Sequence, residues 1–272
     1  MAEKNILLTA FDDRWRRFRK EWDRTRRKYS QDSIHDLRVA SRRLLAVLDT
    51  LRNLLNDSVL QDCRRRVKKS LDTLGPLRDV HVQRTYISTV IDRYPQLEAF
   101  ERSLASKEDQ IARKVQNVLK ESPGLGHAMA QARRHARKRI KKETILNFID
   151  KRFRKLLELE AQIDPSNTQT IHETRLAFKK FRYTCEVAQP IIRKRVGLDQ
   201  LKQFRSFQTM MGDIQDIEVL SDALSKWAQK RGAEQELQPA FEELRNERRK
   251  RIAIFMESRG QVHTFWEPDV KK

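Results

Sequence analysis

An internal repeat constrains the fold of this chain more than any other feature of its sequence. A segment that begins I-H-D-L-R at Ile34 returns 137 residues later as I-H-E-T-R at Ile171. The same offset aligns L-G-P-L-R-D-V-H-V, from Leu74, with M-G-D-I-Q-D-I-E-V, from Met211, without a gap. Because both halves keep the same distance from histidine to glycine, the sequence predicts two copies of one structural unit.

The two histidine segments predict amphipathic helices. On an α-helix of 3.6 residues per turn, the apolar residues of the first segment fall within roughly 100° of arc, the width of a core-facing stripe. These residues are Leu37, Ala40, Leu44, Val47, Leu48 and Leu51. In the second segment the stripe is expected at Ala177, Phe181, Cys185 and Ala188.

A line of cationic side chains lies opposite the apolar stripe of each predicted helix. The two lines are His35, Arg38 and Arg42 in the first helix and His172, Arg175 and Lys179 in the second. At 1.5 Å per residue each line is about 10 Å long. A histidine opposite the core face does not fill the core, so each line is a candidate binding surface.

The composition favours an all-α fold. Only seven Gly and seven Pro accompany 35% charged residues, and no segment alternates apolar and polar residues over a sustained length. We expect one unit over 1–272, with repeat halves at about 6–125 and 132–260 and an irregular tail at 261–272.

Glycines are expected to end helices in both halves. Gly75 and Pro76 predict a break after the third helix. In the second half, the equivalent helix is expected to end near Met211, before Gly212, and a separate helix to run to about Arg231.

The boundary between the halves is expected after the S-P-G-L-G segment at 122–126, the strongest break in the chain. A run of positive charge follows, from Arg133 to Lys142. Runs of this kind are usually solvated, so we expect it on the exposed face of a helix.

The charge balance predicts polyanionic partners. Lys and Arg number 58 against 38 Asp and Glu, which gives a formal net charge of +20. Such an excess attracts polyanions and makes their association dependent on salt. It does not identify the polyanion.

Catalytic, metal and cofactor functions are not predicted. The sequence has no Walker-type glycine loop, no H-E-x-x-H and no G-x-S-x-G motif. Cys63 and Cys185 are not repeat equivalents and have no C-x-x-C context, so neither a disulfide nor a zinc site is indicated. Cys185 is expected in the core.

No apolar segment is long enough to cross a membrane, and the N-terminal apolar run is too short for a signal peptide. We therefore expect a cytoplasmic protein without membrane association.

The repeated motif resembles that of the CHAD domain, the conserved histidine α-helical domain. It reads H-x-x-R-x-x-x-R-R from His35 and H-x-x-R-x-x-x-K-K from His172, each followed by a later G-x-x-x-D turn. The resemblance covers nearly the whole chain. It implies two antiparallel helical bundles related by a pseudo-twofold axis, a basic channel that binds inorganic polyphosphate, and association with polyphosphate granules.

The expected polyphosphate contacts are the two cationic lines, their neighbouring basic residues and cations from the third helix of each half. The full set is His35, Arg38, Arg42, Arg43, Arg65, Lys68, His172, Arg175, Lys179, Lys180, Arg182, Lys202 and Arg205. Arg offers a bidentate fork, Lys a point charge and His a donor of variable charge. Asp79 and Asp216 are expected as helix N-caps or partners of basic residues.

Other interpretations stay open. A nucleic acid backbone carries the same repeated phosphates, although only Tyr183 on the histidine helices suits base contacts. A general polyanion binder or a scaffold for acidic partners would use the surface from Arg133 to Lys142. In a purely structural alternative, the histidines cap or pack, and the arginines pair with carboxylates of the next helix.

Overall fold

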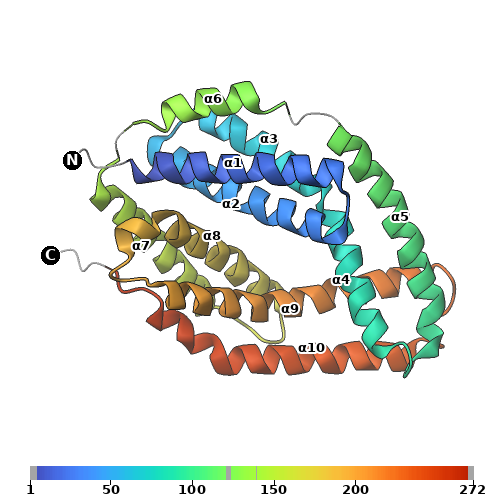
Figure 1. The fold of residues 1–272 in the computed structure, drawn as a ribbon. Helices are drawn as coiled ribbons and strands as arrows, with labels where there is room; N and C mark the ends of the chain where they lie inside the picture. The colour runs from blue at the N-terminus through green and yellow to red at the C-terminus, as the bar shows by residue number, and fades with distance from the viewer. Residues whose placement is uncertain (1–4, 121–123, 139, 269–272) are drawn as a thin grey trace.

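The structure, a computed structural model, describes residues 5–120, 124–138 and 140–268, and all regular secondary structure within them is helical. Figure 1 shows the arrangement. The elements in chain order are α1 (Ile6–Arg27), α2 (Gln31–Leu55), α3 (Ser58–Thr73), α4 (Gly75–Val90), η1 (Pro95–Leu97), α5 (Glu98–Lys120), α6 (Gly126–His135), α7 (Lys142–Glu160), α8 (Thr168–Ile192), α9 (Leu198–Gln229), α10 (Gln238–Ser258) and η2 (Arg259–Thr264). The all-α prediction is confirmed.

The helix boundaries follow the sequence repeat. Both histidine helices have 25 residues, and α8 begins and ends 137 positions after α2. The α1 and α7 helices precede them, and α5 and α10 follow later in each half. The repeat detected in the sequence is therefore also a repeat in the order of helices.

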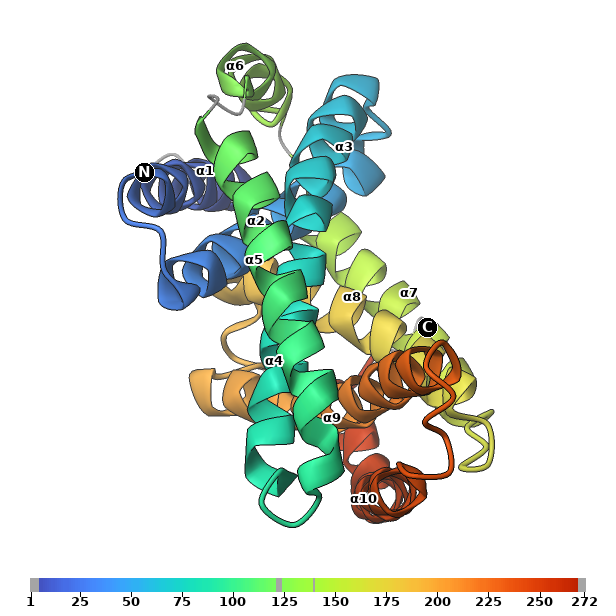
Figure 2. The same cartoon turned by 90° about the vertical axis from the view of Figure 1, so that its right-hand side faces the viewer.

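Two apolar cores hold the molecule together. The larger core takes most of its side chains from α1 to α3, from α6 to α8 and from the first part of α9, with further ones from α4, α5, α10, η2 and the two aromatic residues after it. The smaller one joins α4 and α5 to the end of α9 and to α10. Figure 2 shows α4 and α5 running together from the α3 side of the molecule to the α9 and α10 side. Within the larger core, α2 packs directly against α8, which brings the two predicted lines of cations to one region.

The buried stripe of α8 differs by one residue from the prediction. Phe178 is fully buried, with its ring 4.9 Å from that of Phe207, whereas Ala177 is only partly buried. Phe181 and Cys185 are buried as expected. Phe181 lies three residues after Phe178, and Cys185 lies four residues after Phe181, so the three follow the helical period.

The predicted helix end at Gly212 is wrong, because α9 continues through that residue to Gln229. The equivalent position in the first half does separate α3 from α4 at Gly75. The difference follows from the next residue. Pro76 lacks an N–H group and cannot lie inside a helix without breaking a hydrogen bond, whereas Asp213 has one.

The predicted irregular tail is also wrong in its first part. The segment Arg259–Thr264 forms η2, and the two following aromatic residues are buried. The ring of Phe265 lies 4.8 Å from that of Phe204, and Trp266 Nε1 donates a 2.7 Å hydrogen bond to Asp150. Residues 269–272 of the expected tail lie outside the described residues.

The positively charged run after the first half is not a helix along its length. It begins in α6, which ends at His135, and α7 starts only at Lys142. Its first members are partnered: Arg133 forms an ion pair with Asp12 at 2.7 Å, and His135 contacts Asp57. Arg139, within this run, and residues 121–123, in the expected break, lie outside the described residues.

Candidate anion-binding site

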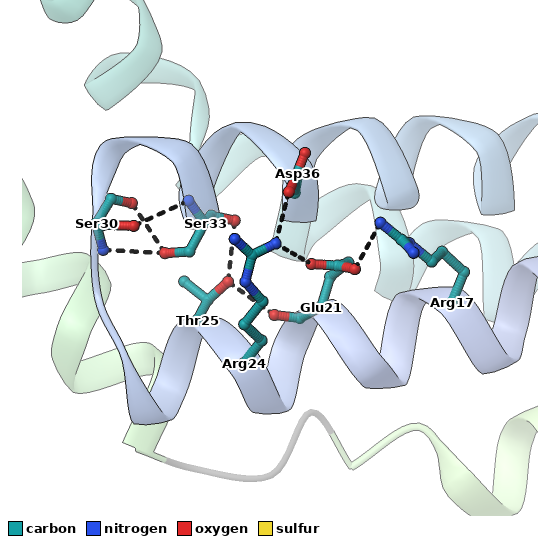
Figure 3. A network of polar contacts seen from close by, with 7 residues as sticks. All are labelled: Arg17, Glu21, Arg24, Thr25, Ser30, Ser33 and Asp36. Atoms are coloured by element: carbon teal, nitrogen blue, oxygen red, sulfur yellow. Dashed lines mark hydrogen bonds and ion pairs between the residues drawn. The ribbon is translucent and has the colours of Figure 1, made fainter.

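The start of α2 is fixed by reciprocal capping. Ser30 accepts a hydrogen bond from the backbone N–H of Ser33, and the Ser33 hydroxyl accepts one from the backbone N–H of Ser30. Thr25 of α1 then donates its hydroxyl to the Ser33 carbonyl at 3.0 Å. Figure 3 shows how these contacts join the end of α1 to the start of α2. Capping boxes satisfy N–H groups that a helix start leaves unpaired, so the position of the histidine helix is set locally.

The carboxylate beside His35 is already engaged by α1. Arg24 contacts Asp36 at 2.6 Å and the buried Glu21 at 3.3 Å, and Arg17 contacts Glu21 from its other side at 2.8 Å (Figure 3). Asp36 is therefore paired with Arg24 of α1. The structure shows no ion pair between Asp36 and the cationic line His35, Arg38 and Arg42 among the described residues.

The packing of α2 on α8 brings four cations of the predicted lines together: Arg38 and Arg42 from α2, and Arg175 and Lys179 from α8. We call these four residues the crossing cluster. Burial and the nearby charges of the other three residues and Arg182 together lower the pKa of Lys179 to about 8, with burial the largest cause. Burial, Arg42 and Arg78 lower the pKa of Arg38 to about 10, against an opposing effect of Asp79. The positive charges of α2 and α8 therefore repel one another across the contact between the two helices.

Several N–H groups of the crossing cluster have no acceptor among the described residues. They are Nε and Nη1 of Arg38, Nε of Arg42 and Nε of Arg175, all inaccessible to solvent. The structure shows no ion pair from these three arginines or from Lys179 to a described carboxylate within 4.0 Å. Buried donors without acceptors are costly, and the purely structural interpretation, in which these arginines pair with the next helix, is not what the described residues show.

Arg78 of α4 lies next to the cluster and is held in place by α9. It forms a bidentate contact with Asp216, at 2.6 and 2.7 Å, and the hydrogen bonds raise the Arg78 pKa. The expected role of Asp216 as a partner of a basic residue is confirmed. Asp79 lies 3.5 Å from Arg78 and has the same kind of role.

Gly212 lies beside the cluster and does not terminate a helix. A Cβ atom at this position would lie 3.8 Å from Nε and Nη2 of Arg175, an ordinary contact distance. The guanidinium of Arg175 therefore lies over the backbone of α9. Burial lowers its pKa, and the nearby Asp216 opposes this effect.

Three cavities in the described part of the chain are lined by α2, by α8 or by both. The largest of these three, of about 670 Å³, includes His35, Arg38 and Arg78 in its wall. A second, of about 390 Å³, is lined by basic residues of three helices and also by Asp13 and Glu186. Those basic residues are Arg14, Arg17, Arg43 and Arg205. Because Arg38 lines the first cavity and Arg43 the second, α2 presents cations to both.

The two histidines lie in different cavities. His35 is exposed at the wall of the largest cavity. His172 lines a third one, of about 250 Å³, where its Nδ1 atom contacts Oε1 of Gln215. Gln215 occupies the repeat position of Arg78, so the two histidines differ in their nearest polar neighbour.

The predicted cations of the third helices are mostly paired and exposed. Arg65 lies 3.5 Å from Asp62, Lys68 contacts Asp72, and Lys202 lies 2.8 Å from Asp199. Each of these three side chains is more than half exposed. They are not brought into the crossing cluster.

The remaining predicted cations occupy intermediate positions. Arg43 and Lys180 are exposed, and Arg205 lies 3.8 Å from Glu186. Arg182 is buried, 3.8 Å from the same Glu186, and its guanidinium stacks on Tyr183 at 4.4 Å. Arg182 thus has partners within α8.

Sequence reasoning missed Arg78, Arg14 and Arg17. Arg78 is part of the aligned glycine segment, and Gln215 occupies its position in the second half. This difference between the repeats could have identified Arg78 as a candidate site residue. Arg14 and Arg17 lie on the polar face of α1, where no motif distinguishes them from other surface arginines. Only the packing of α1 beside α2 places them at the second cavity.

No helix among the described residues is long and apolar enough to cross a membrane. A comparison with curated protein sequences gives no match. Among solved structures, the fold is similar to the CHAD domain from the plant Ricinus communis, with a TM-score of 0.77 and 17% identity, covering 98% of this chain and 93% of that chain. It is also similar to PptA from Streptomyces chartreusis, with a TM-score of 0.70 and 14% identity, covering 95% of this chain and 98% of that chain.

At such identities the likeness to solved structures establishes the fold alone. The sequence profile of the CHAD domain matches residues 9–225, which is well over half of the chain and includes both histidine helices. The chain therefore belongs to the CHAD domain family.

Proposed function

We propose that this protein binds inorganic polyphosphate through the crossing cluster without catalysing a reaction. The observation that supports this best is the set of buried guanidinium N–H groups without acceptors on Arg38, Arg42 and Arg175. Phosphate oxygens are strong acceptors, and their negative charge balances the positive charge of these guanidinium groups, which have no carboxylate partner among the described residues. Membership of the CHAD family favours this ligand.

Polyphosphate also suits the distribution of cations around the cluster. A phosphate chain has no base, sugar or apolar face, so its recognition depends on charge and donors repeated along a path. Arg38 of the cluster lines the largest cavity together with Arg78, and Arg43 of the same helix lines the second cavity together with Arg205. A phosphate chain bound at the cluster has further cations available in both cavities.

A competition titration tests the proposal. Labelled long-chain polyphosphate is displaced by unlabelled polyphosphate, single-stranded DNA or duplex DNA at physiological salt. We expect polyphosphate to compete at least about tenfold better per phosphate, which corresponds to about 1.4 kcal/mol. Equal competition by DNA would favour a nucleic-acid or general polyanion binder.

A pair of double variants separates the crossing cluster from general charge. Arg38→Gln with Arg175→Gln removes two cluster charges, and we expect it to weaken polyphosphate binding by tenfold or more. Arg65→Gln with Lys202→Gln removes the same charge from exposed, ion-paired positions, and its effect should be less than about threefold. Equal losses in both variants would show that the cluster is not the site.

Two further measurements test the other parts of the proposal. Gel analysis of polyphosphate after long incubation with the protein should show unchanged chain length; shortening would identify a hydrolase. Fluorescence microscopy of a tagged protein should show it on polyphosphate granules. A diffuse signal in cells that contain granules would contradict granule association.

A further inference from the structure

The largest cavity has two chemically different ends. One end, next to the crossing cluster, carries His35, Arg38 and Arg78, with Asp213 and Asp216 beside them. The other carries Tyr86 of α4 and two ion pairs that involve α10. Binding of a bare phosphate chain accounts for the cations of this cavity, but not for its carboxylates, its tyrosine or its apolar side chains.

The far end presents carboxylates as well as cations. Glu243 lies 3.1 Å from Arg93, and Glu247 lies 2.8 Å from Arg251. The Arg251 guanidinium lies 5.7 Å from the ring centroid of Tyr86. A carboxylate repels a polyanion and can accept further hydrogen bonds from a ligand that carries amino or hydroxyl groups.

Part of the cavity wall is apolar. Val82 and Val90 of α4 and Ile217 and Leu220 of α9 line the cavity, and the last three of these residues also belong to the smaller core. Burial and the nearby Glu247 and Glu243 raise the pKa of Tyr86 to about 12, which keeps its hydroxyl protonated. A pocket of several hundred Å³ with apolar walls and a few polar groups is typical of sites for organic ligands.

The repeat-related cavity lacks these features. At the positions equivalent to Arg78 and His81, the second half has Gln215 and Glu218, and the cavity there measures about 250 Å³. The two halves therefore contribute differently to the large cavity, which is lined by α2 and α4 of the first half and by α9 and α10 of the second. A role shared equally by both halves does not explain it.

We propose that the large cavity binds a nucleoside phosphate, in a site additional to that of polyphosphate. The phosphates lie at His35 and Arg38, and the base lies against the apolar wall beside Tyr86. An exocyclic amino group of the base donates to Glu243 or Glu247. The two sites share Arg38, but the inference does not depend on polyphosphate binding.

Calorimetric titration of the wild-type protein with three probes tests the inference directly. The probes are ATP, inorganic tripolyphosphate and adenosine, without divalent cations. ATP and tripolyphosphate have the same number of phosphates, so charge alone predicts similar affinities. We expect ATP to bind at least tenfold more tightly than tripolyphosphate, and adenosine to bind weakly. Equal affinities of ATP and tripolyphosphate would overturn the inference.

A matched pair of variants locates the site. Thr85 is exposed on α4 and lines the cavity, whereas Ser88 is exposed on the same helix and does not line it. Thr85→Trp should weaken ATP binding tenfold or more and leave tripolyphosphate binding within about threefold. Ser88→Trp should leave both within about threefold. An equal effect of the two variants on ATP would contradict the assignment.

The outcomes also separate this inference from the proposed function. If long-chain polyphosphate binds, and ATP binds no better than tripolyphosphate, the nucleoside site is wrong and the polyphosphate site stands. If ATP binds in the expected manner and polyphosphate does not, the reverse holds.

Discussion

Lys179 is charged among four other cations. Burial and the charges of Arg175, Arg42, Arg182 and Arg38 lower its pKa to about 8, against an ordinary value of 10.5. Keeping this side chain protonated at neutral pH therefore costs free energy in the folded state. A bound polyanion removes that cost, because it supplies the opposite charge.

Replacement of Lys179 should separate stability from binding. Lys179→Met removes the charge and keeps an unbranched apolar side chain. We expect the free energy of unfolding at pH 7 to rise by on the order of 1–2 kcal/mol, in line with the size of the pKa shift after allowance for partial exposure. Polyphosphate affinity should fall. Urea denaturation and binding titration measure the two effects. A loss of stability would contradict the argument that burial and neighbouring positive charges make the protonated Lys179 costly.

Lys179 also predicts a pH dependence of binding. Its pKa in the free protein is about 8, and a polyanion raises it, so binding above pH 8 requires uptake of a proton. Affinity should be highest below pH 8 and decline as the pH rises to 9 and beyond. Titrations at pH 7, 8 and 9 measure this decline. Lys179→Arg keeps its charge over this range, so its affinity should depend less on pH. The same slope of affinity against pH in both proteins would exclude Lys179 as the source of the pH dependence.

At the level of the helices, the two halves differ most at the segment after the glycine. Residue types explain that difference: Pro76 ends a helix, and Asp213 allows one to continue. The long α9 connects both cores, since its first part belongs to the larger and its last part to the smaller. Its continuity therefore fixes Asp216 relative to Arg78 and Arg175.

Asp213→Pro should disrupt this connection. Proline in the middle of α9 removes a backbone hydrogen bond and clashes with the preceding turn, which costs about 3 kcal/mol. Pro76→Ala, at the start of α4, should change stability by less than about 1 kcal/mol, because the first N–H groups of a helix need no partner within it. Chemical denaturation of both variants compares the costs. Similar values would mean that α9 bends at Gly212 in solution.

Over the whole molecule, which carries a formal net charge of +20, some cations form ion pairs and others have no carboxylate partner. Arg65, Lys68 and Lys202, exposed on α3 and α9, have carboxylate partners three or four residues away. The crossing cluster combines cations from two halves of the chain and has no such partners among the described residues. Buried positive charge without a carboxylate partner is therefore present where the two repeats meet.

Polyphosphate should stabilise the folded protein as a whole. Its site needs both α2 and α8, so only the folded chain presents it. At a free concentration of one hundred times the dissociation constant, linkage predicts about 2.7 kcal/mol of added stability, or a rise in Tm of several degrees. Differential scanning fluorimetry measures the shift. Arg38→Gln with Arg175→Gln should lose most of it at the same ligand concentration, and an undiminished shift would place the binding elsewhere.

The sequence alone determined the helical class, the repeat and the cationic lines on the histidine helices, because helical periodicity and a constant offset are local properties of the chain. It also contained the reason for the continuous α9, at Asp213. The tertiary structure decided which cations meet: Arg38, Arg42, Arg175 and Lys179 gather where α2 crosses α8, while Arg65, Lys68 and Lys202 pair locally. It also separated His35 from His172 and buried Trp266. Ion pairing and burial depend on neighbours from distant segments, and the position of those neighbours follows from packing.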